Sequence, residues 1–566
     1  MKGGIRRVVV VAAACCAAAL SPLNGPAGQS ARAESIRDVP LRPNVEPAQR
    51  RPSIVLIVLD DASLNVVATM RNVRAMARRS AVYRNAFVAD SFCCPSRAAM
   101  FTGMPPHLNG VLTNSSGGPG PVRGGWPAFR MNGNLARSYN VPLRQAGYRT
   151  GFVGKYLNEY NLRVRDGRRL PPPPVPGWDD FEALLPAAYA GWGFFRTSGP
   201  GDRLRMRLVR KPPRSATRRV KDRSYAQTVI TRRALHLIGE YRQAAEPYFL
   251  QVSTYAPHAR LEPAWPNEPI YPAAFADRPS KARPGGNCGL RSCFSLGFRD
   301  LVGYRDPPGD NRPVRLLRGG GTRVTRPWRP RLTMPDALAL TRLRERARMV
   351  QSVDRMIGRI RTAVGRNTYV ILTSDNGYHI GQHSLNAGKG APYDTDTRVT
   401  LMVTGPAVKA GPRHQFISNI DLAATLETLA GLRPSGFRVG RSFAPSLSRP
   451  KARGSRFVFI HHTQNLASRD DPDAEPWEVD RIPSYQAVRS RHGLLVRLDL
   501  DSSWRGKRYV WELYRYDRPW EDRNVFRSDR RKPWARALMR HLRAWDGCAV
   551  EECRAATTRP LLDASH

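Results

Sequence analysis

The chain has 566 residues, of which 41% are apolar and 24% are charged. This apolar share is enough for one large or two ordinary hydrophobic cores, and the ordinary share of charged residues argues against wholesale disorder. The charge is unbalanced, because 91 Lys and Arg face 46 Asp and Glu, which gives a formal net charge of +45 at pH 7. A polytopic membrane protein, a collagen-like fibre and a small disulfide scaffold are all excluded by this composition.

The first 33 residues are typical of a secretory signal peptide. A basic start, MKGGIRR, precedes an apolar run of 13 residues from Val8 to Leu20, which is too short to span a bilayer. A small-x-small cleavage site, Ala-Arg-Ala, follows at residues 31–33. A buried helix is the alternative, but basic residues precede the run and a Pro- and Gly-containing stretch follows it. We therefore expect a secreted protein with no transmembrane segment, in which residues 34–50 form a linker.

The cysteines suit an oxidising compartment. Two of the eight lie in the predicted signal peptide, and four form two pairs with a spacing of five residues, each of which predicts a small disulfide loop. Two adjacent cysteines, Cys93 and Cys94, are left over, which is unusual in an exported protein. The predicted disulfides are Cys288–Cys293 and Cys548–Cys553.

From residue 51 onward, short apolar strands alternate with helical patterns. Ser53–Leu59 is a continuous β-branched and aliphatic run, as expected for a strand that is covered on both faces. This alternation predicts an α/β sandwich on a mostly parallel sheet, in which ligands bind at the carboxyl ends of the strands. The other predicted strands are Arg149–Val153, Tyr248–Thr254, Thr368–Thr373 and Val399–Val403, and the predicted helices are Asn65–Arg78, Leu135–Ala146, Tyr225–Tyr241, Pro335–Val364 and Asp421–Leu432.

Two regions depart from this alternation. Residues from about 196 to 220 and from 260 to 333 are crowded with Arg, Pro and Gly, and they predict long surface insertions around the mouth of a site. After about residue 452, alternating strands followed by a helix predict a smaller α+β domain. The predicted division is a main domain over 51–450 with insertions at about 196–333, a C-terminal α+β subdomain over 451–553 and a tail over 554–566.

The excess of basic residues has two interpretations. Only ten of the 91 are lysine, so arginine accounts for about nine-tenths of them. Because the arginines are spread along the whole chain, codon bias explains them simply; the alternative is a positive field that gathers polyanions. Neither a zinc finger nor a helix-turn-helix or RNA-binding pattern accompanies them, so we do not expect nucleic acid as a partner.

Hard oxygen ligands follow two of the predicted strands. Asp60 and Asp61 come directly after the first strand, and Asp375 and Asn376 come directly after the strand that begins at Thr368. Oxygen donors at adjacent strand ends suit Ca²⁺ or Mg²⁺ rather than zinc. Taken singly, such pairs are more often turns or helix caps, but their presence at the same edge of one sheet predicts a metal site.

The segment SFCCPSRAAMFTG, residues 91–103, combines a thiol, a helix start and a cation. Pro95 favours the first turn of a helix, which would place Cys93 near amide donors that can seat an anion. Arg97 adds a planar guanidinium that matches a tetrahedral oxyanion. The alternative is a buried structural cysteine, which is common for a free thiol.

The same segment resembles the signature of the type I sulfatases, C-x-P-S-R-x-x-x-(apolar)-T-G, and fits it at every fixed position from Cys93 to Gly103. The resemblance implies an alkaline-phosphatase-like sandwich and a sulfuric ester hydrolase. It also implies that formylglycine-generating machinery oxidises Cys93 to formylglycine (3-oxoalanine), whose hydrated aldehyde attacks the sulfur of a sulfate ester beside a calcium ion. Cys94 then occupies a variable position.

Further segments follow this family in chain order. GKYLN at 154–158 and DNGYH at 375–379 resemble the N-acetylglucosamine-6-sulfatase and extracellular glucosamine-6-sulfatase branch, which implies a sulfated sugar or glycosaminoglycan as substrate. APH at 256–258 resembles the family segment whose histidine contacts the sulfate ester. Where many sulfatases have a histidine two places after the first lysine, this chain has Leu157. The implied catalytic residues are Cys93, Arg97, Lys155, His258 and Lys389, the implied calcium ligands are Asp60, Asp61, Cys93, Asp375 and Asn376, and the implied substrate contacts are His379 and His383.

Three alternatives stay open. A phosphomonoester or phosphodiester hydrolase would use the same fold, since phosphate and sulfate share their shape. A non-catalytic binder of sulfated polyanions would use the positive charge and keep an unmodified thiol at position 93. For His379 and His383, packing of their loop is the alternative to substrate contact.

Overall fold

The computed structural model describes residues 51–117, 121–185, 191–244, 246–258, 263–268, 273–307, 309–329, 332–464, 482–501, 508–517 and 520–560. All of them belong to one compact unit, Arg50–His566. The predicted signal peptide and linker, with Cys15 and Cys16, lie outside the described residues.

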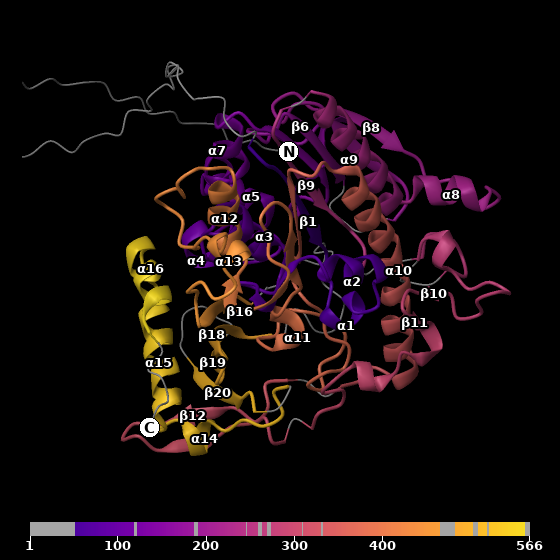
Figure 1. Cartoon of the computed structure of the whole chain (residues 1–566). Coiled ribbons are helices and arrows are strands. Elements are labelled where there is room, and N and C mark those ends of the chain that lie inside the picture. Colours follow the sequence, from indigo (N-terminus) through magenta and orange to yellow (C-terminus); the bar gives the residue numbers. More distant parts are fainter. Residues whose placement is uncertain are drawn as a thin grey trace, which may run out of the picture. The chain divides into compact units, whose positions relative to one another are not determined.

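A ten-stranded sheet forms the centre of this unit (Figure 1). Its middle is parallel, because β1 (Ser53–Leu59) pairs in parallel with β14 (Thr368–Ser374) and with β9 (Tyr248–Ser253), and β9 pairs in parallel with β3 (Arg149–Gly154). Antiparallel pairs occur on both sides of this middle, so the prediction of a mostly parallel α/β sheet is confirmed. The order is β16-β2-β15-β14-β1-β9-β3-β6-β7-β8, with β2 (Ala81–Phe87), β6 (Asp180–Leu185), β7 (Phe194–Ser198), β8 (Arg205–Val209), β15 (Leu401–Thr404) and β16 (Gly411–Ser418).

Successive side chains of β1 point to opposite faces of the sheet, and because both sets are apolar, both faces are covered by other elements. Those on one face, including Ile57, join a core with α9 and α10, and those on the other face, including Leu56, join a core with α3 and α12. Every residue of β1 is buried, and each fully buried aliphatic side chain stabilises the fold by roughly 1.5–3 kcal/mol. The helices are α3 (Cys93–Thr102), α9 (Ala226–Gln243), α10 (Asp336–Ala363) and α12 (Asp421–Leu429).

Two predicted helices are each divided into two. The helix predicted over Asn65–Arg78 is α1 (Leu64–Val67) and α2 (Arg71–Ala77). The helix predicted over Leu135–Ala146 is α6 (Asn134–Arg137) and α7 (Asn140–Gln145). Pro142 accounts for the second break, because a proline has no N–H to donate and is tolerated only in the first turn of a helix. The other helices around the main sheet are α4 (Pro106–Asn109), α5 (Gly125–Met131), α8 (Arg218–Ser224), α11 (Asp394–Thr397) and α13 (Pro445–Ser448).

Part of the region expected to be a surface insertion extends the sheet. Strands β7 and β8 lie at one edge, and most of the side chains of β8 are exposed, including Arg205 and Arg207. An exposed edge strand rich in arginine does not show the alternation of a half-buried strand, which is why its sequence resembles a loop. The small hairpin β4 (Arg163–Arg165) and β5 (Arg168–Leu170) is also exposed.

A second, antiparallel sheet of six strands lies in the C-terminal region, in the order β13-β12-β20-β19-β18-β17. Strands β12 and β13 come from the long insertion, and Val314 of β12 pairs with Trp511 of β20. The division of the chain near residue 450 stays a prediction, since this sheet draws on both sides of it. The strands of this sheet are β12 (Val314–Leu316), β13 (Thr322–Val324), β17 (Phe457–His462), β18 (Ser484–Ser490), β19 (Gly493–Asp499) and β20 (Tyr509–Arg515). The helices of the C-terminal region are α14 (Phe526–Asp529), α15 (Pro533–Trp545) and α16 (Val550–Thr558).

Both predicted disulfides are confirmed. Cys288–Cys293 closes the hairpin of β10 (Asn287–Cys288) and β11 (Arg291–Ser292), and Cys548–Cys553 links the end of α15 to α16. Cys93 and Cys94 are the cysteines of the described residues that form no disulfide. Within the same residues, none of the helices combines the length and the apolar character that crossing a bilayer requires.

Candidate active site

The carboxyl ends of β1 and β14 bring the two acidic pairs together. The strands are parallel neighbours with Leu59 opposite Ser374, so the residues that follow them meet at one sheet edge. The backbone N–H of Asp61 donates to Oδ1 of Asp375 at 3.1 Å, and the side-chain amide of Asn376 donates to Oδ1 of Asp61 at 2.6 Å. The predicted juxtaposition of these residues is therefore present.

Helix α3 points the thiol of Cys93 at these carboxylates. Its sulfur lies 3.5 Å from Oδ1 of Asp60 and 3.7 Å from Oδ1 of Asp61. The side chain of Cys94 points the other way and packs in the hydrophobic core beneath α3, while its backbone N–H donates to Asn114 at 3.0 Å. Of the two adjacent cysteines, the one selected by sequence register thus faces the polar cluster.

Three buried cations surround the acidic group. Nε of Arg97 donates to Oδ2 of Asp375 at 2.8 Å, and Nζ of Lys155 donates to Oδ1 of Asp60 at 2.9 Å. Lys389, in the loop after β14, contacts the carboxylate of Asp61. None of the three is more than 2% exposed, so these pairs lie in a low dielectric where charge interactions are strong.

Lys389 and His258 complete the cluster around position 93. The ammonium of Lys389 lies 2.6 Å from the Cys93 sulfur and 2.8 Å from Oδ1 of Asp61. Nε2 of His258, in the loop after β9, lies 3.2 Å from Oδ2 of Asp61 and 3.5 Å from the Lys389 ammonium. All five predicted catalytic residues are therefore in one connected cluster.

Burial shifts the ionisation of the cluster. It raises the pKa of Asp60 to about 6, although the nearby ammonium of Lys155 opposes the shift. Burial lowers the pKa of Lys155, but the attraction of Asp60 outweighs it and the net direction is upward. The pKa of Arg97 is also raised, because Asp375 and Asp60 favour its charged form more strongly than burial disfavours it.

The donor atoms of the cluster fit a hard divalent cation. Asp60, Asp61, Cys93 and His258 each offer one ligand atom, and these atoms all lie within 4.8 Å of one another. In addition, Oδ2 of Asp60 and Oδ1 of Asn376 are buried and accept no hydrogen bond from the described residues. Buried acceptors without a donor are costly, and carboxylate and amide oxygens are the ligands that Ca²⁺ prefers. Asp60, Asp61 and Cys93 of the predicted ligands belong to this group, Asn376 offers its amide oxygen beside it, and His258 is an additional donor that was not predicted as a ligand.

A buried arginine that sequence analysis missed supports this site from α10. The guanidinium of Arg346 donates to the backbone oxygens of Asp61 and, at 3.0 Å, of Pro257, and it lies 4.0 Å from the ring centroid of Tyr378. It thereby joins the loop after β1 to the loop after β9. The only sequence signal is its place on the apolar face of α10, which an arginine-rich helix obscures.

A second support comes from β16. The side-chain amide of Asn419, just after that strand, donates to Oγ of Ser96 at 2.8 Å and to its backbone oxygen at 3.1 Å. Oγ of Ser96 in turn donates to the backbone oxygen of Asp375. The first turn of α3 is therefore fixed through its serine to the loop that carries Asp375.

The two predicted substrate-contact histidines are buried near the cluster's loop. Nδ1 of His379 lies 2.9 Å from Asp396, and its backbone pairs with Gly388, next to Lys389. His383 stacks on Tyr393 with 3.9 Å between ring centroids and lies 3.4 Å from Glu521. Burial lowers the pKa of His383.

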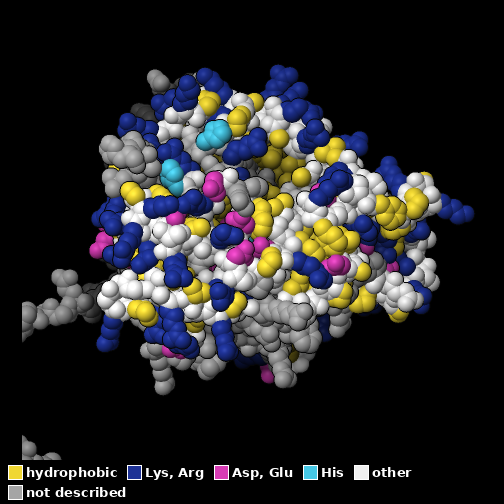
Figure 2. Space-filling model, turned by 90° about the horizontal axis from the view of Figure 1, so that it is seen from below, with side chains coloured by type: hydrophobic (Ala, Val, Ile, Leu, Met, Phe, Trp, Pro, Cys, Tyr) yellow, Lys and Arg dark blue, Asp and Glu magenta, His cyan; other side chains and the backbone are white. Residues whose placement is uncertain are grey.

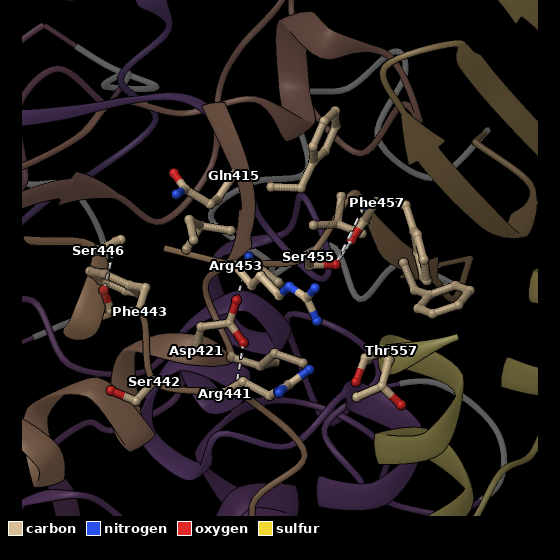
Figure 3. A pocket seen from close by; sticks show the side chains of 18 of the residues that line it. Gln415, Asp421, Arg441, Ser442, Phe443, Ser446, Arg453, Ser455, Phe457 and Thr557 are labelled. Atoms are coloured by element: carbon tan, nitrogen blue, oxygen red, sulfur yellow. Dashed lines mark hydrogen bonds between the residues drawn. The ribbon is translucent and has the colours of Figure 1, made fainter. Parts of the chain in front are cut away.

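A separate cavity of about 380 Å³ lies between β16, the start of α12, β17 and the ends of α15 and α16 (Figure 3). Asp421 lies beside Arg441 there, and its carboxylate accepts the backbone N–H of Arg441 at 2.7 Å. None of the predicted site residues lines this cavity. A further cluster of metal-ligating residue types, His107 with Cys548 and Cys553, is not a thiolate site, because the two sulfurs form a disulfide.

Comparison with known proteins identifies relatives over most of the chain. A family model described as Sulfatase matches residues 52–432. The chain is 29% identical over 412 residues to an extracellular sulfatase SULF-1 homolog of Drosophila melanogaster, covering 70% of this chain and 31% of the relative. It is 26% identical over 388 residues to the N-acetylglucosamine-6-sulfatase of Homo sapiens, covering 68% of this chain and 61% of the relative. The chain thus spans less than two thirds of these curated relatives.

Solved structures share the fold at low identity. A protein in complex with its substrate D-glucosamine-2-N,6-O-disulfate has a TM-score of 0.59 and 19% identity, covering 91% of this chain and all (100%) of that one. A phosphonate monoester hydrolase from Silicibacter pomeroyi has a TM-score of 0.53 and 17% identity, covering 87% and 94%. At these identities the likeness establishes the architecture, an alkaline-phosphatase-like sandwich.

Proposed function

The chain belongs to the sulfatase family, whose model matches residues 52–432, and from this premise we propose that it is a secreted sulfuric ester hydrolase that removes sulfate from a sulfated sugar or glycosaminoglycan. One observation carries the proposal. The side chain at position 93 lies between the carboxylates of Asp60 and Asp61 and the ammonium of Lys389, at the start of a helix. A nucleophile placed there faces cations that can stabilise an oxyanion.

We propose that position 93 is formylglycine in the mature enzyme and that the cation is Ca²⁺. Asp60, Asp61, Asp375 and Asn376 would hold the ion together with residue 93. The aldehyde hydrate would supply a nucleophilic hydroxyl and a second hydroxyl for releasing sulfate, and the cation would supply Lewis acidity toward that hydroxyl and the sulfate oxygens. Since Cys93 is fully buried, we propose that formylglycine-generating machinery acts on it before the chain folds.

The chain's own residues would bind and orient the sulfate group. Without a metal ion the side-chain charges of the cluster nearly cancel, because three carboxylates face Arg97, Lys155 and Lys389. A divalent cation would therefore leave the site positive and ready for an anion. Lys155 and Lys389 would hold sulfate oxygens, while Arg97, fixed by Asp375, would keep the metal-ligand loop in place as well as adding charge.

His258 is the proposed proton donor to the departing alcohol. Its Nε2 lies within 3.5 Å of the Lys389 ammonium, so the two groups reach the same side of position 93. A sugar alcohol has a high pKa and leaves poorly without a proton, so a positioned acid is worth about 10²–10⁴ in rate. Lys389 is the second candidate for this transfer.

For the substrate we propose a sulfated hexosamine, with the 6-sulfate of N-acetylglucosamine as the first choice. The support is the resemblance of the GKYLN and DNGYH segments and the names of the relatives, among them N-acetylglucosamine-6-sulfatases. His379 stays a proposed substrate contact because its backbone pairs beside Lys389. The contacts of His383 with Tyr393 and Glu521 favour support of the loop.

The decisive experiment follows residue 93. Mass spectrometry of the peptide that contains Cys93, from protein secreted by its natural host, should show the aldehyde in place of the thiol. Cys93→Ala should abolish hydrolysis of N-acetylglucosamine 6-sulfate, whereas the matched variant Cys94→Ala should keep it within a few-fold, since Cys94 packs in the core. An intact thiol in active protein would refute the mechanism, and faster hydrolysis of a matched phosphate ester would favour the phosphoesterase alternative.

A further inference from the structure

A basic groove lies in the C-terminal region, and none of the residues of the proposed catalytic cluster lines it. It has a volume of about 410 Å³ and runs between the β12–β13 hairpin and α15. Figure 1 shows β12 and α14 side by side near one end of α15. Five of its eight lining residues are arginine and none is acidic, the arginines being Arg530, Arg531, Arg536, Arg540 and Arg543.

Arginine alone does not mark a site in this chain. Figure 2 shows Lys and Arg side chains scattered across the face that it draws, where they are more frequent than Asp and Glu. Elsewhere, however, arginines often pair with acids, as Arg144 does with Asp179. In the groove, Arg536, Arg540 and Arg543 are exposed, and the described residues offer their guanidinium groups neither an ion pair nor a hydrogen bond.

The arrangement of these arginines is set by helix geometry. Arg536 and Arg540 are four residues apart, and Arg540 and Arg543 are three apart, so their side chains lie on one outward face of α15. The opposite face, which includes Leu538 and Leu542, is buried in the core. Like charges at these spacings destabilise a helix. The packing of α15 must therefore offset the repulsion among the three arginines.

The nearest acid in sequence does not neutralise the groove. Asp529 is already paired, accepting from Nε of Arg515 at 2.7 Å and lying 3.0 Å from Nζ of Lys532. On the other wall, Arg530 donates to the backbone oxygen of Gly320 at 3.1 Å, which ties α14 to the hairpin. This bond ties two walls of the groove together, and no acidic side chain is among the described residues that line it.

We propose that this groove binds a sulfated polysaccharide as an exosite, holding the polymer while its end or a side branch is desulfated elsewhere on the enzyme. The guanidinium fork matches the oxygens of a sulfate group, which stays ionised at physiological pH. From Arg536 to Arg543 the helix advances about 10 Å, a distance that a chain with several sulfates can follow and one sulfate ester cannot. Leu316 and Met539 add apolar surface for sugar rings. The choice of polymer rests on the proposed function.

The test compares two triple variants with equal loss of charge. One replaces the groove arginines, Arg536→Gln, Arg540→Gln and Arg543→Gln. The matched control replaces three exposed arginines at β8 and after it, Arg205→Gln, Arg207→Gln and Arg214→Gln. Binding of heparin, chemically desulfated heparin and a DNA duplex is measured across a salt series on the full chain, after thermal melting has verified that each variant is folded.

We expect the groove variant to bind heparin at least about tenfold more weakly, with a salt slope smaller by about 2 to 3, and the control to stay within twofold. Equal weakening in the control, or unchanged binding in the groove variant, would overturn the inference. Desulfated heparin bound as tightly as heparin would overturn it too, and tighter binding of the duplex would assign the groove to nucleic acid. An Arg→Lys triple at the same positions should recover part of the affinity, because it keeps charge without the fork.

Kinetics separate this inference from the proposed activity. The groove variant should raise KM for a sulfated polysaccharide about tenfold with kcat unchanged, and kcat/KM for a monosaccharide sulfate should stay within twofold. A parallel loss on the monosaccharide sulfate would overturn the exosite, because the groove would then act on the catalytic cluster. Binding needs no turnover, so a chain that binds heparin through the groove yet hydrolyses no sulfate ester would contradict the proposed function alone.

Discussion

The ammonium of Lys389 lies 2.6 Å from the sulfur of Cys93, closer than either carboxylate of the strand-end pair. Lys389 also contacts Asp61 at 2.8 Å, so one cation lies against both the proposed nucleophile position and a proposed metal ligand. Its side chain is 2% exposed, which strengthens both interactions.

Replacing Lys389 by Ala should therefore lower kcat about 10²- to 10³-fold, the usual cost of removing a buried group that stabilises transition-state charge. Lys389→Arg should recover little, because a guanidinium cannot occupy the place of a compact ammonium or give up a proton. Steady-state kinetics on a monosaccharide sulfate measure kcat of both variants. Lys409→Ala, at an exposed lysine after β15, is the control and should leave kcat unchanged.

Arg346→Ala should lower kcat about 10- to 100-fold while changing KM less. Arg346 donates to the backbone of Asp61 and Pro257, so its loss would let the loops that carry Asp61 and His258 move apart, and small misplacements are costly. Arg346→Lys should not restore activity, because one ammonium cannot replace the planar fork. The exposed Arg359 on the same helix gives the control Arg359→Ala, and equal losses in both variants would mean a general effect on α10.

Removing divalent cations should lower Tm by a few degrees, and Ca²⁺ should restore it. Binding at a hundred times Kd stabilises the folded state by about 2.7 kcal/mol, and it relieves buried acceptors such as Oδ2 of Asp60. Thermal melting before and after chelation measures the shift without relying on activity. The double variant Asp60→Asn and Asp375→Asn should melt at one temperature with and without Ca²⁺; a retained shift would place the ion elsewhere.

Asp306 should make stability depend on pH. Burial raises the pKa of Asp306 from 3.8 to about 7, so the folded state favours its protonated form. The stability that this gives is fully present below about pH 4 and is lost as the pH rises through 7. Asp306→Asn should therefore raise Tm relative to wild type at pH 8 and much less at pH 5. Asp202→Asn, at an exposed acid, should show no such difference; an equal Tm difference for Asp306→Asn at both pH values would refute the assignment.

Sequence patterns predicted what local chemistry determines. The run of β1 predicted a buried strand, because its residues are rich in β-branched side chains and seven residues are fewer than a buried helix usually has. The strand ends then predicted the meeting of Asp61 with Asp375, and the register of the cysteine motif predicted which thiol faces them. These features depend on residues that are neighbours in sequence or on adjacent strands.

Other features could not be predicted because they depend on distant partners. The arginine-rich composition hides Arg346, which is distinguished only by its tertiary contacts with two loops. Likewise, the sequence around Val314 resembles a surface insertion, and only its pairing with Trp511 makes it part of a sheet. Pro142 did carry a usable signal, since it requires a helix to begin just before it.

The pairing of β1 with β14, which are far apart in sequence, also means that the site can form only late in synthesis of the chain. The cluster around position 93 includes Lys389, so it cannot form until the ribosome has added about 300 residues beyond the cysteine, which takes roughly 15–60 s at ordinary elongation rates. During that interval the cysteine segment has no β14 to cover it. Slow codons or a stalled ribosome before Lys389 would lengthen the time in which an oxidising enzyme can reach the thiol, and fast translation would shorten it.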